Sequence, residues 1–200
     1  MKRVLAIGAH FDDIEIGCAG TLLQHSQKGD SIFVSILNAH EEKTGLVADR
    51  FKEQTNSLEK LDIDFSHLIL FNGFKLYHDH EIIKKLDIIE PDIIYIPWDK
   101  DSHQDHRICS GVGLSVGRNR KVSTLMYHCG STIDFNPNLF NIIDWIKKLD
   151  ILNCFETQIR HGAINIDIIK AQERYFATLI SEEKDAYAEG FVSRKMRYVV

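Results

Sequence analysis

The sequence predicts an α/β protein, a Rossmann-like three-layer sandwich with a mostly parallel central sheet. Short apolar runs alternate along the chain with segments of helical periodicity, and repeated strand–helix–strand units require parallel pairing. Several runs are apolar almost throughout, as expected of strands that are buried on both faces. Right-handed crossovers then produce an open, doubly wound sheet, in which ligands bind beyond the C-terminal ends of the strands.

The first two-thirds of the chain contain five predicted strands, with helices between them. The strands are expected over Arg3–Gly8, Ser31–Asn38, His67–Phe71, Asp92–Pro97 and Thr124–His128. The helices are expected over Ala48–Leu61 and Glu81–Ile89, the second because Ile82, Ile83, Leu86 and Ile89 form one helical stripe. A further helix is expected to follow the first strand.

The pattern after residue 135 is less regular. It predicts a strand over Leu139–Asp144, a helix over Trp145–Phe155 and a longer charged helix over Gln172–Arg197. No linker, internal repeat or low-complexity stretch interrupts the 200 residues. We therefore expect a single domain over residues 1–200.

Composition narrows the class of protein further. Hydrophobic residues make up 44% of the chain, and its formal net charge is −5, so it is expected to be globular and to lack the basic field that holds nucleic acid. No apolar stretch reaches the roughly 18 residues of a membrane span. The four cysteines are scattered, which fits buried thiols in a reducing compartment. These observations predict a soluble, cytoplasmic protein.

Polar side chains follow the first predicted strand directly. His10, Asp12 and Asp13 occupy the turn where a dinucleotide-binding protein would carry glycines. The carboxylates would repel phosphate, whereas imidazole and carboxylate together suit zinc and related divalent ions. His10 and Asp13 can supply two positions of a tetrahedral site while Asp12 remains free. The alternative is that both aspartates only cap the following helix.

A second polar cluster follows the fourth predicted strand. His103 and His106 offer one further nitrogen ligand and one free imidazole, and Asp105 between them can orient a ring. For either histidine taken alone, a solvated polar loop is the better interpretation. Because neighbouring parallel strands bring both clusters to one crevice, we expect an open metal site with three protein ligands. Such a site, with spare acids beside it, indicates metal-assisted hydrolysis.

Both clusters also match the motifs of a known family. Ala9–Thr21 follows an Ala-His-Pro-Asp-Asp motif that continues to Gly-Cys-Gly-Gly-Thr, with Phe11 in place of the proline. An Asp-x-His-x-Asp-His motif is matched by Asp101, His103, Asp105 and His106, and weaker matches are Arg50 with Glu53, Gln158 and Ala188–Phe191. In these residues the sequence resembles the LmbE-like, or PIG-L-type, zinc-dependent N-deacetylases of sugar conjugates. The likeness spans the chain, but only the two acidic–histidine motifs are specific.

The resemblance implies a role for each residue of the first cluster. His10, Asp13 and His106 would bind Zn²⁺, although Fe²⁺ or Co²⁺ would also suit these ligands. Asp12 would act as general base and take the proton of a zinc-bound water that attacks an amide carbonyl.

Further roles follow from the same resemblance. His103, if protonated, would stabilise the oxyanion or donate a proton to the leaving amine, and Asp105 would orient a neighbouring histidine. Arg50 would contact a hydroxyl or anionic group of the substrate, or else form an ordinary surface pair with Glu53. From its position alone, near the end of the fifth predicted strand, His128 is expected to face the crevice and bind substrate, or else to be structural.

The activity that the resemblance implies is removal of the acetyl group from an N-acetylamino sugar or glycoconjugate of the N-acetylglucosamine type. Two alternatives are metal-dependent hydrolysis of another amide or an ester bond, and a non-catalytic sugar- or metal-binding role on the same fold. The expected partner is a small N-acetylated sugar, and the resemblance allows a homo-oligomer.

Overall fold

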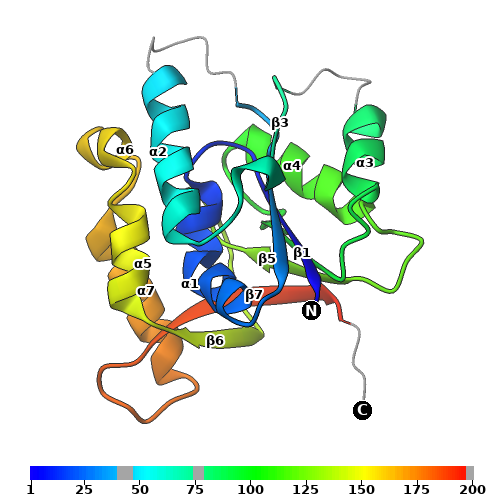
Figure 1. Ribbon diagram of the computed structural model, residues 1–200. Coiled ribbons are helices and arrows are strands. Elements are labelled where there is room, and N and C mark those ends of the chain that lie inside the picture. Colours follow the sequence, from blue (N-terminus) through cyan, green and yellow to red (C-terminus); the bar gives the residue numbers. More distant parts are fainter. Residues whose placement is uncertain (40–46, 74–78, 197–200) are drawn as a thin grey trace.

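The computed structural model describes residues 1–39, 47–73 and 79–196, in which one mixed sheet of seven strands has the order β3-β2-β1-β4-β5-β7-β6 (Figure 1). The strands are β1 (Arg3–Gly8), β2 (Ser31–Ile36), β3 (Leu68–Leu70), β4 (Ile93–Pro97), β5 (Ser123–Tyr127), β6 (Leu139–Ile143) and β7 (Tyr187–Lys195). The helices are α1 (Asp13–Gln27), α2 (Val47–Lys60), α3 (Asp79–Asp87), α4 (Gln104–Ser115), α5 (Trp145–Leu152), α6 (Glu156–Arg160) and α7 (Ile166–Thr178), with a short 3₁₀ helix η1 (Phe65–His67). The predicted α/β class with a mostly parallel sheet is confirmed.

The order of the strands creates a switch point between β1 and β4. From β1 the chain runs outward through β2 to β3, and it then returns to β4, which pairs in parallel with the other side of β1. The helix after β1 packs in the core on one face of the sheet, and the helix after β4 packs in the core on the opposite face. A crevice opens beyond the C-terminal ends of two such strands, and it is where sheets of this class bind ligands.

Side-chain alternation along β1 separates the two cores. Val4 and Ala6 belong to one core and Leu5 and Ile7 to the other, and all four are 0% exposed. Helices α1, α2 and α5 contribute to the first core, while α3 and α4 contribute to the second. The continuous apolar character of this strand is therefore explained by helices that cover both faces of the sheet (Figure 1).

The C-terminal part differs from the prediction. A single helix over Gln172–Arg197 is wrong, because α7 ends at Thr178 and β7 pairs antiparallel with both β5 and β6. Charged residues in this segment, among them Glu189, favoured an exposed helix in the sequence analysis. In the structure the carboxylate of Glu189 is buried and lies 2.7 Å from Nζ of the buried Lys148. A charge compensated by a distant residue leaves no local signal in the sequence, so tertiary pairing decides the structure here.

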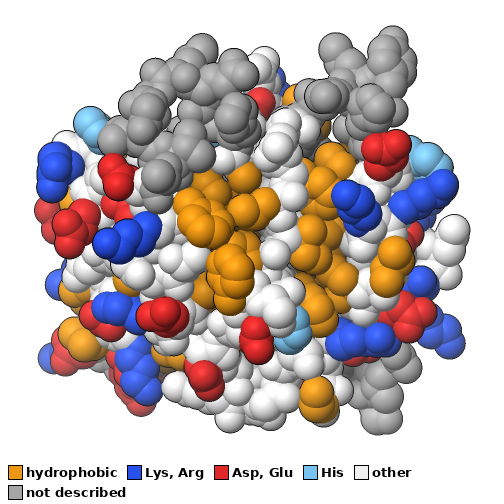
Figure 2. Space-filling model, turned by 45° about the horizontal axis from the view of Figure 1, so that its top comes forward, with side chains coloured by type: hydrophobic (Ala, Val, Ile, Leu, Met, Phe, Trp, Pro, Cys, Tyr) orange, Lys and Arg blue, Asp and Glu red, His pale blue; other side chains and the backbone are white. Residues whose placement is uncertain are grey.

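Two features of the described residues concern membrane-spanning helices and surface charge. None of the described helices is long and apolar enough to cross a membrane. Figure 2 shows hydrophobic side chains in the centre of one face, with basic and acidic side chains interspersed around them. On the described part of this face, side chains of both charges therefore surround the hydrophobic ones.

Candidate active site and metal centre

The loops that follow β1 and β4 meet at a cavity of about 320 Å³. The structure therefore brings together the two polar clusters that lie about ninety residues apart in the sequence, as the parallel pairing of their strands requires. The residues that line the cavity are His10, Asp12, Asp13, Ile16, Arg50, His103, His106, Gly130, Ser131, Gln158 and Ala163.

Asp13 contacts both of the histidines that are predicted to share a metal with it. Its Oδ2 accepts hydrogen bonds from the backbone N–H groups of Ala9 (3.0 Å) and His10 (2.8 Å), and it lies 3.6 Å from Nδ1 of His10. Its Oδ1 lies 3.2 Å from Nε2 of His106. Burial would raise the pKa of Asp13, but the hydrogen bonds to the two imidazoles outweigh burial and hold it well below its usual range.

His106 lies between two carboxylates. Its Nε2 faces Asp13, and its Nδ1 lies 3.0 Å from Oδ2 of Asp101. Burial would lower the pKa of His106, but hydrogen bonds with Asp101 and Asp13 outweigh burial and raise it to about 10. A cation on Nε2 would replace the proton there, because a histidine ligand must give up the proton of the nitrogen that binds metal.

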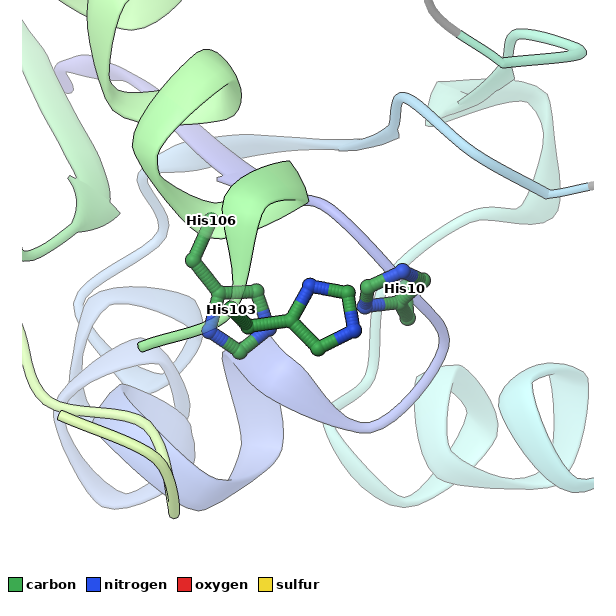
Figure 3. Close-up of side chains that lie close together, drawn as sticks. All are labelled: His10, His103 and His106. Atoms are coloured by element: carbon green, nitrogen blue, oxygen red, sulfur yellow. The ribbon is translucent and has the colours of Figure 1, made fainter. Parts of the chain in front are cut away.

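The three histidine rings lie side by side between the loop after β1 and the start of α4 (Figure 3). The ring centroid of His103 is 4.8 Å from that of His10 and 4.8 Å from that of His106. The histidine that Asp105 orients is His10, whose Nε2 lies 3.0 Å from Oδ2 of Asp105. Because a carboxylate only accepts hydrogen bonds, this contact puts the proton on Nε2 and leaves Nδ1 toward Asp13.

His103 precedes α4 and accepts a hydrogen bond on Nδ1 from the backbone N–H of Asp105 (3.2 Å). This contact places the ring proton on Nε2. Burial lowers the pKa of His103, and the charges of His10 and His106 lower it further. The geometry therefore favours a neutral His103 that donates from Nε2, in place of the protonated ring considered in the sequence analysis.

Asp12 lines the same cavity but has different contacts. Its backbone is left-handed, with φ 93°, and its side chain makes no capping hydrogen bond to α1. Since Asp13 also binds the preceding loop and not the helix, helix capping does not account for either aspartate. Arg50 donates a hydrogen bond to the carbonyl oxygen of Phe11 (2.8 Å) and lies 3.5 Å from Oδ2 of Asp12. Burial raises the pKa of Asp12, and the negative charge of Asp13 raises it further.

The remaining predicted site residues have different surroundings. Arg50 and Glu53 are buried, with 6% and 7% exposed, so they are not an ordinary surface pair. Glu53 accepts hydrogen bonds from the backbone N–H and the hydroxyl of Thr157 (both 2.7 Å), which fixes α6 beside the cavity. His128 is 7% exposed, its Nδ1 lies 3.1 Å from the carbonyl oxygen of Cys129, and burial lowers its pKa to about 4. His128 is not in the described cavity wall, and its contact with substrate stays a prediction.

The donor atoms present fit a divalent cation. Two ligands that each lie ~2.0 to 2.1 Å from a tetrahedral ion are ~3.3 Å apart, and Oδ1 of Asp13 is 3.2 Å from Nε2 of His106. One nitrogen from each of His10, His103 and His106 lies within 4.8 Å of the other two. Atoms of Asp13, His106 and the buried thiol of Cys129 form a second group of the same dimensions.

Sequence reasoning assigned no role to several polar residues at the site. Asn38 donates a hydrogen bond to Oδ2 of Asp105 (3.1 Å), Ser131 lines the cavity, and Asp101 contacts His106. The sequence does indicate Asp101, because it is the first residue of the Asp-x-His-x-Asp-His motif. Asn38 and Ser131 follow the C-terminal ends of β2 and β5, so only their position relative to the strands could have indicated them.

The fold and the site together define a doubly wound α/β protein with a cluster of side chains that could hold a metal ion, and a further carboxylate beside it, at the switch point of the sheet. Residues 5–116 match the family described as GlcNAc-PI de-N-acetylase, or PIG-L. The chain belongs to this family.

Relatives and solved structures agree with this assignment. The chain is 34% identical over 156 residues to the uncharacterized deacetylase YaiS of Escherichia coli K12, covering 71% of this chain and 82% of that protein. It is 26% identical over 135 residues to the diacetylchitobiose deacetylase of Thermococcus kodakarensis, covering 58% and 49%.

Two solved structures share the fold over the whole chain. The conserved protein TT1542 of Thermus thermophilus superposes with a TM-score of 0.82 at 22% identity, covering 100% of this chain and 98% of that one. The 4-carboxy-2-hydroxymuconate hydratase GalB of Pseudomonas putida superposes with a TM-score of 0.77 at 18% identity, covering 100% and 99%. Since one of these proteins is a hydratase, the fold alone does not fix the reaction.

Proposed function

We propose that this protein is a metal-dependent N-deacetylase that removes the acetyl group from an N-acetylamino sugar or glycoconjugate, with zinc as the metal. The observation that carries the proposal is the placement of the buried carboxylate of Asp12 in the same cavity as His10, Asp13 and His106. Membership of the PIG-L family supports it, as do two relatives whose names describe deacetylases.

His10, Asp13 and His106 would hold the cation through Nδ1, the carboxylate and Nε2, respectively. When bound, the ion would acidify a water molecule and polarise the acetamide carbonyl. Zinc is proposed because one carboxylate and two imidazoles are a ligand set that it commonly takes in catalytic sites, while Fe²⁺ and Co²⁺ accept the same donors.

Asp12 is assigned as general base. It accepts a proton from the water as that water attacks the carbonyl carbon, and it delivers the proton to the amine when the carbon–nitrogen bond breaks. Its raised pKa suits this exchange, because a carboxylate of higher pKa is the stronger base. Arg50 holds the turn that carries Asp12 through its hydrogen bond to the carbonyl oxygen of Phe11.

His103 is assigned as a hydrogen-bond donor to the carbonyl oxygen of the substrate. A neutral ring with its proton on Nε2 donates a hydrogen bond that strengthens as negative charge develops on that oxygen. Asp105 orients His10 and is therefore a positioning residue. Arg50, Ser131 and Gln158 in the cavity wall offer donors and acceptors for the hydroxyl groups of a sugar.

Acetate release tests the proposal. Zinc-loaded protein is incubated with N-acetylglucosamine, its glycosides and N,N′-diacetylchitobiose, and the same protein after chelation serves as control. We expect release from at least one sugar with the metal present, loss of release on chelation, and recovery when zinc is restored. If the protein binds zinc and releases acetate from none of them, another amide or ester bond, or a non-catalytic binding role, becomes the better assignment.

A further inference from the structure

Asp101 has a buried carboxylate to which the proposed reaction assigns no role. Its side chain is 0% exposed, and both of its oxygens receive donors. Oδ1 accepts hydrogen bonds from the backbone N–H of His103 (2.8 Å) and the hydroxyl of Ser131 (2.6 Å). Oδ2 accepts one from the hydroxyl of Thr132 (3.0 Å) and lies 3.0 Å from Nδ1 of His106. Every group around this carboxylate is thus a donor or can act as one.

Backbone pairing fixes Asp101 in this position. The loop after β4 and the loop after β5 form a bridge between Asp101 and Thr132. The backbone N–H of Ile133 donates to the carbonyl oxygen of Lys100 (2.9 Å), and that of Ser102 donates to the carbonyl oxygen of Ser131 (3.2 Å). Two neighbouring loops therefore hold the carboxylate, so it is not free to follow a movement of the His106 ring.

This fixed acceptor decides which nitrogen of His106 faces the cavity. A carboxylate has no proton to give, so the contact with Asp101 requires the proton on Nδ1 of His106. Nε2 is then the nitrogen left for a ligand, and it is the one that lies 3.2 Å from Oδ1 of Asp13. Rotation of the ring by a half-turn would remove both contacts.

We propose that Asp101 is a positioning residue of the metal centre, which fixes the ring orientation and the tautomer of His106 so that Nε2 binds the cation. The inference rests on the metal-binding role proposed for His106. It adds that the affinity of this site for the metal depends on Asp101, and this dependence can be measured. Histidine ligands commonly donate their second N–H to a carboxylate, and loss of such a partner typically weakens metal binding ~10- to 100-fold.

Zinc affinity, measured by competition with a chromogenic chelator, tests the proposal without relying on turnover. In Asp101→Asn, one oxygen becomes an NH₂ group that faces other donors, and we expect zinc to bind ~10- to 100-fold more weakly. Ser131→Ala keeps the carboxylate and removes one of its donors, so a smaller loss is expected. Asp87→Asn is the matched control, because Asp87 accepts a backbone hydrogen bond from Gly117 (2.7 Å) away from this cavity.

A second measurement does not depend on how well a variant folds. In zinc-loaded wild type labelled with ¹⁵N-histidine, NMR is expected to show His106 protonated on Nδ1 and bound to metal through Nε2. Metal bound through Nδ1 would overturn the proposal. So would a folded Asp101→Asn protein that binds zinc as tightly as wild type, even if its thermal stability falls. Wild type that binds no zinc contradicts the proposed function itself, and this outcome differs from both.

Discussion

At the scale of single residues, the proposed base occupies a backbone conformation that most residues avoid. The left-handed φ of 93° at Asp12 is sterically unfavourable for a residue with a Cβ, and aspartate and asparagine tolerate that region better than others. Strain of this kind persists where surrounding contacts fix it, and it is concentrated at functional sites. Here the contact is the hydrogen bond from Arg50 to Phe11, which holds the turn in place.

Asp12→Asn separates the chemistry of this carboxylate from its backbone. Asparagine suits the same left-handed conformation, so we expect the variant to fold and to keep its metal, since Asp12 is not in the proposed ligand set. Turnover should fall ~10²- to 10⁴-fold because the proton acceptor is lost. Acetate release and zinc content are measured on the same sample. A variant that keeps more than about a tenth of wild-type turnover would show that another group is the base.

At the scale of elements, α4 is held close to the sheet by a glycine. A Cβ at Gly113 would lie 2.3 Å from Cγ2 of Ile96 on β4, so only a residue without a side chain allows this approach. The same helix carries His106 in its first turns. The distance between α4 and β4 therefore helps to set where the imidazole meets the loop after β1.

Two alanine substitutions on α4 test this packing. Gly113→Ala should lose about 1 to 3 kcal/mol of unfolding free energy through overpacking against Ile96. Gly111→Ala is the matched control: a Cβ there meets nothing within 4 Å, so it should gain up to about 1 kcal/mol from helix propensity. Denaturant unfolding measures both. Equal effects of the two changes would mean that close packing at Gly113 is not the reason for its glycine.

At the scale of the whole molecule, a buried charge network joins elements from both halves of the chain. Nζ of Lys148 on α5 donates to Glu173 on α7 and to Glu189 on β7, and all three side chains are almost fully buried. Glu189 also accepts hydrogen bonds from the backbone N–H groups of Gly20 (2.8 Å) and Thr21 (2.7 Å), just after non-helical backbone at Cys18 interrupts α1. We propose that residues 1–200 form one domain, since this network connects α1 to the last strand.

The network predicts a dependence of stability on pH. Burial raises the pKa of Glu173 to about 7 from 4.5, with the charge of Glu189 adding to the shift and Lys148 opposing it. A carboxyl whose pKa is raised by folding stabilises the native state below pH 4.5. That contribution, on the order of 3 kcal/mol, is lost as the pH rises to about 7.

Glu173→Gln should remove this dependence. The difference in unfolding free energy between wild type and the variant is measured from pH 4 to 8 by denaturant titration, with the exposed Glu183→Gln as control. As the pH rises from about 4.5 to about 7, we expect wild type to lose stability relative to the variant. A difference that stays constant over this interval would mean that Glu173 is ionised in the folded protein throughout.

The sequence by itself determined the parallel part of the sheet and the meeting of two polar clusters. Strand β1 has the predicted bounds, because a strand covered on both faces is apolar along nearly its whole length, and here only Arg3 at its start is exposed. The alternation of strands and helices predicted that His10 to Asp13 and His103 to His106 lie at the same edge of the sheet, since parallel strands all end there, and the structure pairs β1 with β4. Both of these results depend on patterns of neighbouring residues.

Only the tertiary structure decided what depends on distant partners. Glu189 could not be placed in a buried strand without Lys148, which lies 41 residues earlier. The partner of Asp105 proved to be His10, across 95 residues, and Arg50 turned out to hold the turn at Phe11 across 39 residues. Which nitrogen of a histidine faces a cavity depends on the carboxylate behind the ring. That orientation is fixed only when the loops pack together in the folded protein.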